Sequence, residues 1–168
     1  MLFQQKGVNI GDTHSICNEK TRKSFIQMQY TQLGWMNTTT LDDALLEGLF
    51  DLYSGIDVMK MDVEGFEPSV LAGANRFFES KYAPSYIFLE FTSKTVSTSV
   101  GSADARDYMK SILIHLKNHG YELLSRGGGG QAINVSIQNN TLDEVVKEVD
   151  GGDLIFVHQL QQRPDFTH

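Results

Sequence analysis

Two short apolar runs, each ending near an acidic residue, constrain the fold of this chain more than any other feature. The first run covers residues 56–61 and leads into Asp62, and the second covers residues 86–91 and carries Glu90. Between them, apolar residues recur at the helical spacing i, i+1, i+4, i+7 and i+8, namely Val70, Leu71, Ala74, Phe77 and Phe78. A strand, a helix and a strand in about 35 residues predict a βαβ unit with two parallel strands and a right-handed crossover.

The stretch Lys60-Met61-Asp62-Val63-Glu64-Gly65 lies where the first of these strands ends. Parallel strands bring their carboxyl ends to the same edge of a sheet, which is where open α/β sheets bind ligands. Lys60 and Asp62 leave the same face of an extended chain, and Glu64 follows them if the extension continues. We therefore expect these three side chains to lie beside Glu90, with partners that offset the desolvation of the Asp62 carboxylate.

The region before this unit has weaker patterns. Residues 1–24 predict a poorly defined lead-in loop with one short strand around Val8 and Ile10. Residues 25–30 alternate in polarity, which predicts a half-buried strand that ends near Gly34. Thr40-Leu41-Asp42-Asp43 resembles a capping box with Asp in place of Glu, and it predicts a helix whose apolar positions reach Leu49.

The region after this unit alternates between helical and extended patterns. A helical stripe predicts a helix over residues 103–118, which Gly120 terminates. Residues 121–124 and 153–157 predict two further strands. Thr141 and Glu144 form a capping box that predicts a short helix ending near residue 150, and the helix beginning at Pro68 is expected to end near Ser80.

Composition limits the classes of partner. The chain has 168 residues, enough for one domain with a core, and its net charge of -7 without a basic run excludes nucleic acid as the main partner. No apolar run approaches the ~20 residues of a membrane span, so we expect no membrane insertion and, by default, a cytoplasmic location. Cys17 is the single cysteine, and with only His14 nearby it does not predict a metal site.

Three local signatures, in this order, resemble the FkbM-type family of S-adenosylmethionine-dependent methyltransferases. They are Thr39-Thr40-Leu41-Asp42-Asp43, the Lys60–Gly65 string followed by Leu71-Ala72-Gly73-Ala74, and Ile87-Phe88-Leu89-Glu90. The likeness is best over residues 35–91. It implies an α/β, Rossmann-like class I methyltransferase sheet.

The glycine-rich first turn and the second-strand acid of such methyltransferases are not found in this sequence. The resemblance therefore implies an amino-terminally truncated sheet, with strands four to seven. It places a single partial domain over residues 1–160, followed by a tail over residues 161–168.

The resemblance also implies S-adenosyl-L-methionine as cofactor and a small-molecule methyl acceptor, with O-methylation of a hydroxylated molecule or sugar. Asp62 is the first candidate to orient the acceptor or serve as base, Glu64 the second, and Glu90 a hydrogen-bond partner of the acceptor hydroxyl. Lys60 and Asp62 are the candidate cofactor-binding residues. Structural roles remain open: Lys60 pairing with Asp57 or Glu90, and Glu64 and Glu67 stabilising the positive end of a helix.

Two other functions remain open from the sequence. Asp62 and Glu64 form an Asp-x-Glu pair that a metal-dependent glycosyltransferase-like enzyme uses to hold a divalent cation on a nucleotide-sugar. The chain is alternatively an inactive interaction module whose acidic residues are solvated. The sequence indicates neither the acceptor nor the oligomeric state.

Overall fold

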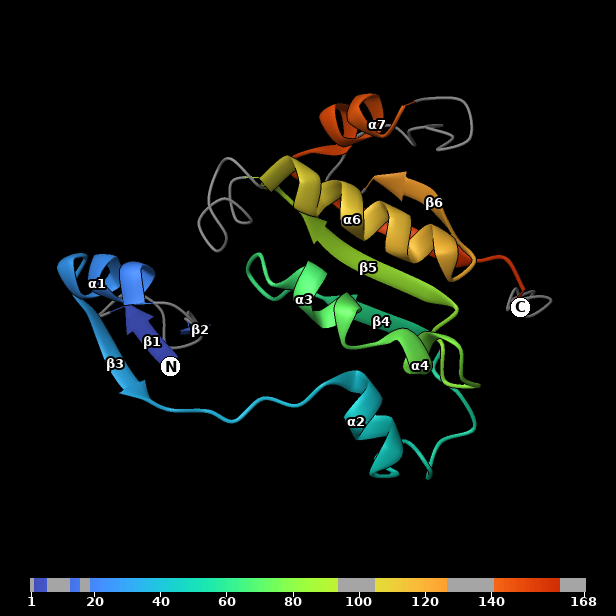
Figure 1. Cartoon of the computed structure of the whole chain (residues 1–168), viewed down its shortest axis with the longest axis horizontal. Coiled ribbons are helices and arrows are strands. Elements are labelled where there is room, and N and C mark those ends of the chain that lie inside the picture. The colour runs from blue at the N-terminus through green and yellow to red at the C-terminus, as the bar shows by residue number, and fades with distance from the viewer. Residues whose placement is uncertain (1, 6–12, 16–18, 94–104, 127–140, 161–168) are drawn as a thin grey trace, which may run out of the picture. The chain divides into compact units, whose positions relative to one another are not determined.

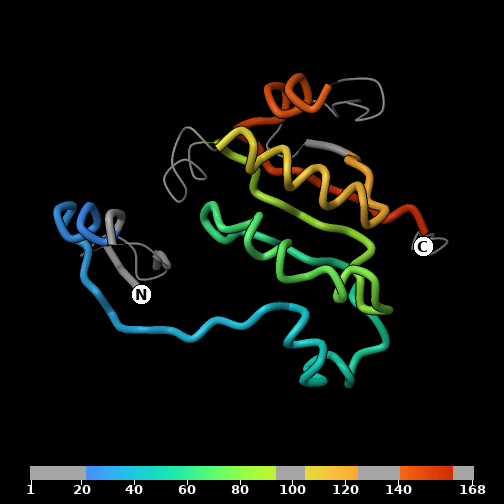
Figure 2. Tube along the Cα trace, in the orientation of Figure 1, coloured from blue at the N-terminus to red at the C-terminus, as the bar shows by residue number. Residues whose placement is uncertain are grey.

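The computed structural model describes residues 2–5, 13–15, 19–93, 105–126 and 141–160. The chain divides into two compact units, Met1–Thr39 and Thr40–His168, which the trace in Figure 2 follows from blue to red. The sequence predicted a single partial domain over residues 1–160 without this boundary. That both units belong to one domain stays a prediction.

The first unit is a small antiparallel sheet with one helix. Its elements are β1 (Leu2–Gln5), β2 (Thr13–Ser15), α1 (Glu19–Gln27) and β3 (Tyr30–Gly34). β1 lies between β2 and β3 and is antiparallel to both. The predicted lead-in loop over residues 1–24 is thus wrong, although the strand expected around Val8 and Ile10 lies outside the described residues.

The predicted strand over residues 25–30 is also wrong, because α1 continues to Gln27. Gln29 has a φ of 63°, a left-handed conformation that ends the helical path and turns the chain into β3. The Phe25 and Tyr30 rings then lie 4.6 Å apart and pack the helix on the strand. Glycine usually occupies such a position, so a glutamine gave no signal. The expected strand end near Gly34 is confirmed.

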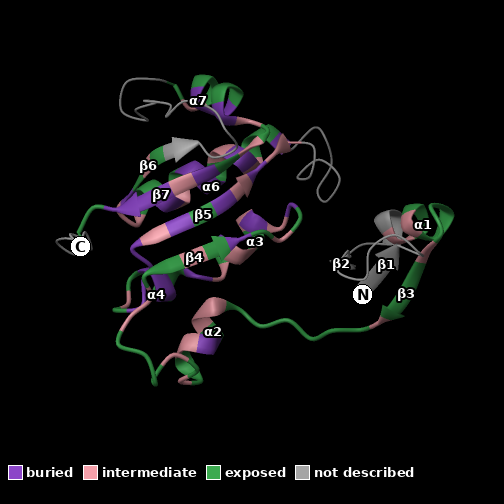
Figure 3. Cartoon of the chain, turned by 180° about the vertical axis from the view of Figure 1, so that it is seen from behind, coloured by how far each residue is buried: buried purple, intermediate pink, exposed green. Residues whose placement is uncertain are grey.

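The second unit is a mixed α/β structure around a four-stranded sheet. The strands are β4 (Val58–Met61), β5 (Tyr86–Phe91), β6 (Tyr121–Arg126) and β7 (Gly152–His158), in the order β4-β5-β7-β6. β4 and β5 are parallel, which confirms the predicted pairing, whereas β7 is antiparallel to both β5 and β6 (Figure 3).

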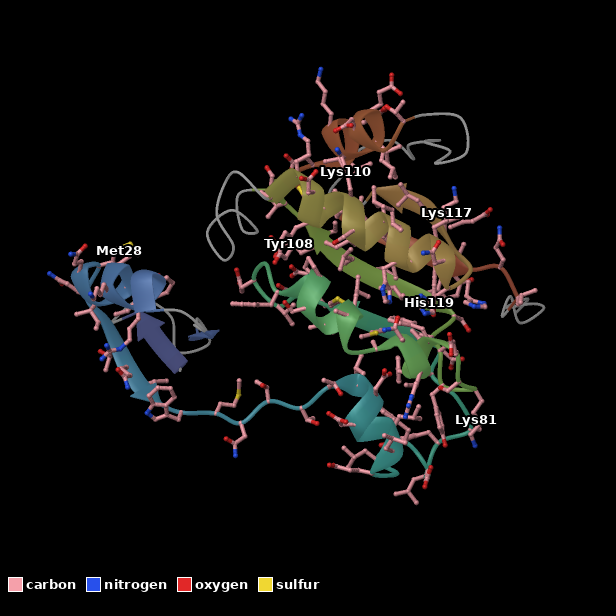
Figure 4. The ribbon with its side chains drawn as sticks, in the orientation of Figure 1. Met28, Lys81, Tyr108, Lys110, Lys117 and His119 are labelled. Atoms are coloured by element: carbon pink, nitrogen blue, oxygen red, sulfur yellow. The ribbon has the colours of Figure 1, made fainter. Side chains whose placement is uncertain are left out.

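Five helices of this unit are described: α2 (Leu41–Leu46), α3 (Glu67–Ala72), α4 (Asn75–Phe78), α6 (Ala105–Asn118) and α7 (Leu142–Val149). The α6 stripe is buried as predicted, and Gly120 follows it with a φ of 81°. The Thr141–Glu144 capping box is confirmed at the start of α7. Lys110 of α6, labelled in Figure 4, lies 2.8 Å from Asp143 of α7 and links the two helices.

The core lies on one face of the sheet. Alternate residues of β5 and β7 are buried there with the α6 stripe: Ile87, Leu89, Phe91, Leu154 and Phe156. α3 and α6 cover this face (Figures 1 and 3). On the other face, Val58 of β4 is 54% exposed and Phe88 of β5 is 39% exposed. The described part of the chain therefore covers the parallel pair from one side only.

The helix expected from Pro68 to Ser80 is broken into α3 and α4 at Gly73. The start of α2 packs against this break: the Asp42 N–H donates to the Gly73 carbonyl at 3.0 Å, and Asp42 Oδ1 accepts from the Phe77 N–H at 2.8 Å. Thr40 caps α2 as predicted, its hydroxyl oxygen accepting from the Asp43 N–H at 2.9 Å. α2 ends at Leu46, so the expected apolar position at Leu49 lies beyond it.

Two further predictions concern a membrane span and the carboxyl-terminal tail. Within the residues described, no helix combines the length and apolar character that a bilayer span requires. The predicted tail over residues 161–168 lies outside the described part.

Candidate functional site

The candidate site lies at the carboxyl ends of β4 and β5. In the parallel register Met61 pairs with Leu89, so Asp62 and Glu90 each follow their strand partners at the same edge of the sheet. This confirms the expected meeting of the two acids. We call the set Lys60, Asp62, Glu64, Glu90 and Asp153 the acidic rim.

Lys60 and Asp62 form an ion pair in the acidic rim. Lys60 Nζ lies 2.7 Å from Asp62 Oδ2, as expected for two side chains that leave the same face of a strand. The hydrogen bond and the charge of Asp62 raise the pKa of Lys60, and the charges of Asp153 and Glu90 add to this. The Lys60 and Asp62 side chains are 73% and 40% exposed, so the expected desolvation of Asp62 is wrong.

The chain does not stay extended after Asp62. Glu64 and Gly65 have φ values of 55° and 88°, and the Phe66 N–H donates to the Val63 carbonyl at 3.3 Å. This tight turn, residues 63–66, carries Glu64 away from the path of the strand. The left-handed conformation costs a residue with a Cβ about 1 kcal/mol or more, and such strain concentrates at functional sites.

Glu67 follows the turn and is only 2% exposed. Its Oε1 accepts hydrogen bonds from the backbone N–H groups of Val63, at 3.1 Å, and Gly65, at 3.4 Å. The sequence argument assigned Glu67 only a favourable position at a helix start. Its contacts show a second role, because the carboxylate binds the turn that precedes its helix.

Glu90 is a carboxyl group of the acidic rim with a raised pKa. Partial burial raises the pKa of Glu90, and the charges of Glu64, Asp62 and Glu67 raise it further, as does a hydrogen bond with the Asp62 side chain. Perturbed carboxyl groups of this kind are typical of sites that transfer protons.

Asp153 belongs to the acidic rim but was not predicted as a site residue. It lies directly opposite Glu90 in the antiparallel pairing of β5 and β7. In the sequence, Asp153 is only an acid that precedes an apolar strand. This is a weak signal of a site, because the sequence of a strand does not identify its neighbour in the sheet.

The acidic rim was also considered as a metal site. Across the described segments, no group of three or more His, Cys, Asp or Glu side chains is arranged to hold a metal ion. Asp62 precedes the 63–66 turn and Glu64 lies within it, so the Asp-x-Glu spacing does not place them as an extended chain would.

Comparison with known proteins identifies one family. Residues 34–123 match the model of the methyltransferase FkbM domain, just over half of the chain. The match includes Lys60, Asp62, Glu64 and Glu90 and ends inside β6. No curated protein and no solved structure matches the chain.

Proposed function

The chain belongs to the family of FkbM methyltransferase domains, and we propose that it serves in the S-adenosylmethionine-dependent methylation of a hydroxyl group on a small molecule or sugar. The observation that carries this proposal is the acidic rim itself. It places two carboxyl groups, Asp62 and Glu90, at the same edge of a parallel strand pair inside the matched region.

The charges of Lys60 and Asp62 suit the cofactor's amino-acid end. An ammonium and a carboxylate 2.7 Å apart are complementary to the carboxylate and amino groups of the methionine part of S-adenosylmethionine. We assign these two residues to cofactor binding. When bound, this cofactor supplies a methyl group that its sulfonium already activates, so the chain's own residues need to orient the acceptor and remove its proton.

Asp62 and Glu90 are the groups we assign to proton removal. The two carboxyl groups follow paired residues at one edge of the sheet, so one can take up the hydroxyl proton while the other hydrogen-bonds the acceptor. Glu64 stands beside them on a fixed turn and adds negative charge that favours uptake of this proton.

We also propose that this sheet belongs to a Rossmann-like class I fold. Parallel strands are normally covered on both faces, whereas Val58 and Phe88 are exposed on one face of the β4–β5 pair. β4 is also the edge of its sheet. We propose that cofactor-binding strands add at this edge, in line with the glycine-rich motif that is not found in this sequence.

Calorimetry distinguishes the proposed function from its two alternatives. The chain and the complete gene product are titrated with S-adenosylmethionine, and separately with manganese and a sugar nucleotide. Heat with the first supports methyl transfer, and heat only with the second supports the metal-dependent glycosyltransferase. No heat with either, from the complete gene product, supports the interaction module.

The change Asp62→Asn tests the assigned proton transfer. In the complete gene product, we expect turnover to fall by a factor on the order of 10² to 10⁴, because the amide cannot take up the proton. Cofactor affinity, measured by calorimetry, should fall much less. Asp57→Asn, before the start of β4, is the matched control and should leave turnover unchanged. Equal losses of turnover and affinity would assign Asp62 to cofactor binding alone.

A further inference from the structure

Glu67 carries a carboxylate at a buried position, where a charge loses its hydration. It is 2% exposed, at the first position of α3 beside the buried Leu71. A buried carboxylate is tolerated only when hydrogen bonds replace its lost water. Both hydrogen bonds of Glu67 Oε1 go to one short segment, through the backbone N–H groups of Val63 and Gly65.

This segment is the turn that ends β4 and presents the acidic rim. Two N–H groups two residues apart converge on one oxygen only if the chain between them curls, which is the conformation seen at Glu64. Asp62 precedes the first of these N–H groups directly. The Glu67 carboxylate therefore fixes the backbone on both sides of Glu64 and immediately after Asp62.

Glu67 also acts on the acidic rim through its charge. Glu90 is near charged groups from β4 and its end, the turn, α3 and β7: Lys60, Asp62, Glu64, Glu67 and Asp153. Among them, Glu67 is buried, and its charge contributes to the raised pKa of Glu90.

We propose that Glu67 is a positioning residue of the acidic rim: its buried carboxylate holds the 63–66 turn and so sets where Asp62 and Glu64 stand relative to Glu90. This inference rests on the proposed methyl transfer only for its effect on catalysis. Its structural content is tested without any turnover.

The first test separates the hydrogen bonds of Glu67 from its charge. In the full chain, NMR follows the carboxyl titration of Glu90 and the hydrogen exchange of the Val63 and Gly65 amides. Glu67→Gln keeps an acceptor oxygen, so we expect exchange within about threefold of the unchanged chain and a lower Glu90 pKa. Glu67→Ala should lower the same pKa and accelerate both amides at least about tenfold.

Two controls guard this test. Glu79→Gln makes the same chemical change at an exposed residue after α4, and it should alter neither readout. Amides in the middle of α6 report on global opening. Two results would overturn the inference: unchanged exchange of both amides in Glu67→Ala, or equal acceleration throughout α6, which would indicate a general loss of stability. An unchanged Glu90 pKa in Glu67→Gln would contradict the effect of the Glu67 charge on Glu90.

The catalytic consequence is read in the complete gene product. We expect Glu67→Gln to move the acidic limb of the pH–rate profile to lower pH, following Glu90, with the KM for cofactor within about twofold. An unmoved limb in an active enzyme contradicts the catalytic part of the inference. Absence of methyl transfer in the unchanged protein removes the proposed function, while the NMR readouts still decide whether Glu67 holds the turn.

Discussion

Glu64 combines a conformation that side chains rarely adopt with a place in a cluster of negative charge. Its φ of 55° would suit glycine, and the charge of Glu64 raises the pKa of Glu90. Both features lower the stability of the folded chain. Retention of a glutamate here is understandable if the carboxylate is needed at the acidic rim, at the expense of stability.

Glycine at this position should stabilise the chain. We expect Glu64→Gly to raise the free energy of unfolding by about 1 kcal/mol relative to Glu64→Ala, because both remove the carboxylate but only glycine relieves the backbone. Urea denaturation of the two variants measures this difference. Equal stability of the two would show that the turn is not strained. Both should reduce methyl transfer in the complete gene product.

His115 is expected to make the stability of the folded chain depend on pH. Partial burial and the charge of His119, whose stacked ring is centred 4.4 Å away, lower the pKa of His115 to about 4 against the opposing charge of Asp42. Its Nε2 is buried without a hydrogen-bond partner. Figure 4 labels His119 at the end of α6.

Stability should therefore fall in mild acid. The unfolded state takes up a proton near the ordinary value of 6.5, whereas folded His115 resists it, so its contribution is complete above pH 6.5 and is lost as pH falls toward 4. In His115→Gln, we expect the free energy of unfolding to change by about 1 kcal/mol less between pH 7 and pH 4.5 than in the unchanged chain. This value is reduced because the ring is partly exposed. Urea denaturation at both pH values measures it. Lys117→Gln, on the same helix, should keep the original dependence, and the same slope in all three proteins would contradict the assignment.

At the residue scale, the sequence predicted the members of the site that lie at strand ends. Asp62 and Glu90 were found because parallel strands share an edge. Glu67 and Asp153 were not, because one acts through backbone groups in a turn and the other through a strand pairing. Neither a turn shape nor the order of strands can be derived from the types of these residues.

At the scale of elements, the junction of α2 with the α3–α4 break carries a sharp steric requirement. A Cβ on Gly73 would lie 2.9 Å from Cγ2 of Thr40, the residue that caps α2. A methyl group at this distance forces the cap to move. The glycine is required by a neighbour from a distant part of the sequence rather than by its own backbone.

Gly73→Ala should destabilise the chain by about 1 to 3 kcal/mol, as overpacking typically does. Thr40→Ser removes the Cγ2 methyl group and keeps the capping hydroxyl, but the Cβ of residue 40 stays 3.0 Å from the added Cβ. We therefore expect it to recover part of this loss in the double variant. Midpoints of urea denaturation complete the cycle. Gly34→Ala, where an added Cβ meets nothing within 4 Å, is the control. Additive effects of the two changes would mean that the contact is not responsible.

The elements that were predicted correctly have signals confined to their own residues. β5, α6 and the capped α7 each combine a clear period with a local terminator. The errors occurred where another part of the chain decides. The expected helix from Pro68 broke because α2 packs against Gly73, and α1 was misread because its end lies at a left-handed glutamine.

At the scale of the whole molecule, the unit Thr40–His168 contains the hydrophobic core described for this chain. The core cluster and the residues packed against it begin at Leu41 and end at Phe156. A unit with its own core is able to fold by itself.

A fragment of residues 40–168 should therefore unfold cooperatively, with its urea midpoint close to that of the main transition of the full chain. Circular dichroism follows the transition. Hydrogen exchange of α6 amides, compared between the two proteins, is the control for a native core. A fragment that lacks a cooperative transition would show that residues 1–39 are needed to form the core.

The border position of β4 has a practical consequence for every experiment on Lys60 and Asp62. The unpaired backbone N–H and C=O groups of an edge strand can hydrogen-bond to an edge strand of another molecule. Charged side chains on such a strand discourage this pairing. Lys60 lies on β4, and Asp57 and Asp62 lie directly before and after it, so neutralising them removes this protection as well as the proposed chemistry. A drop in specific activity after such a change thus has to be normalised to the monomeric, non-precipitated fraction, which light scattering quantifies before any assay.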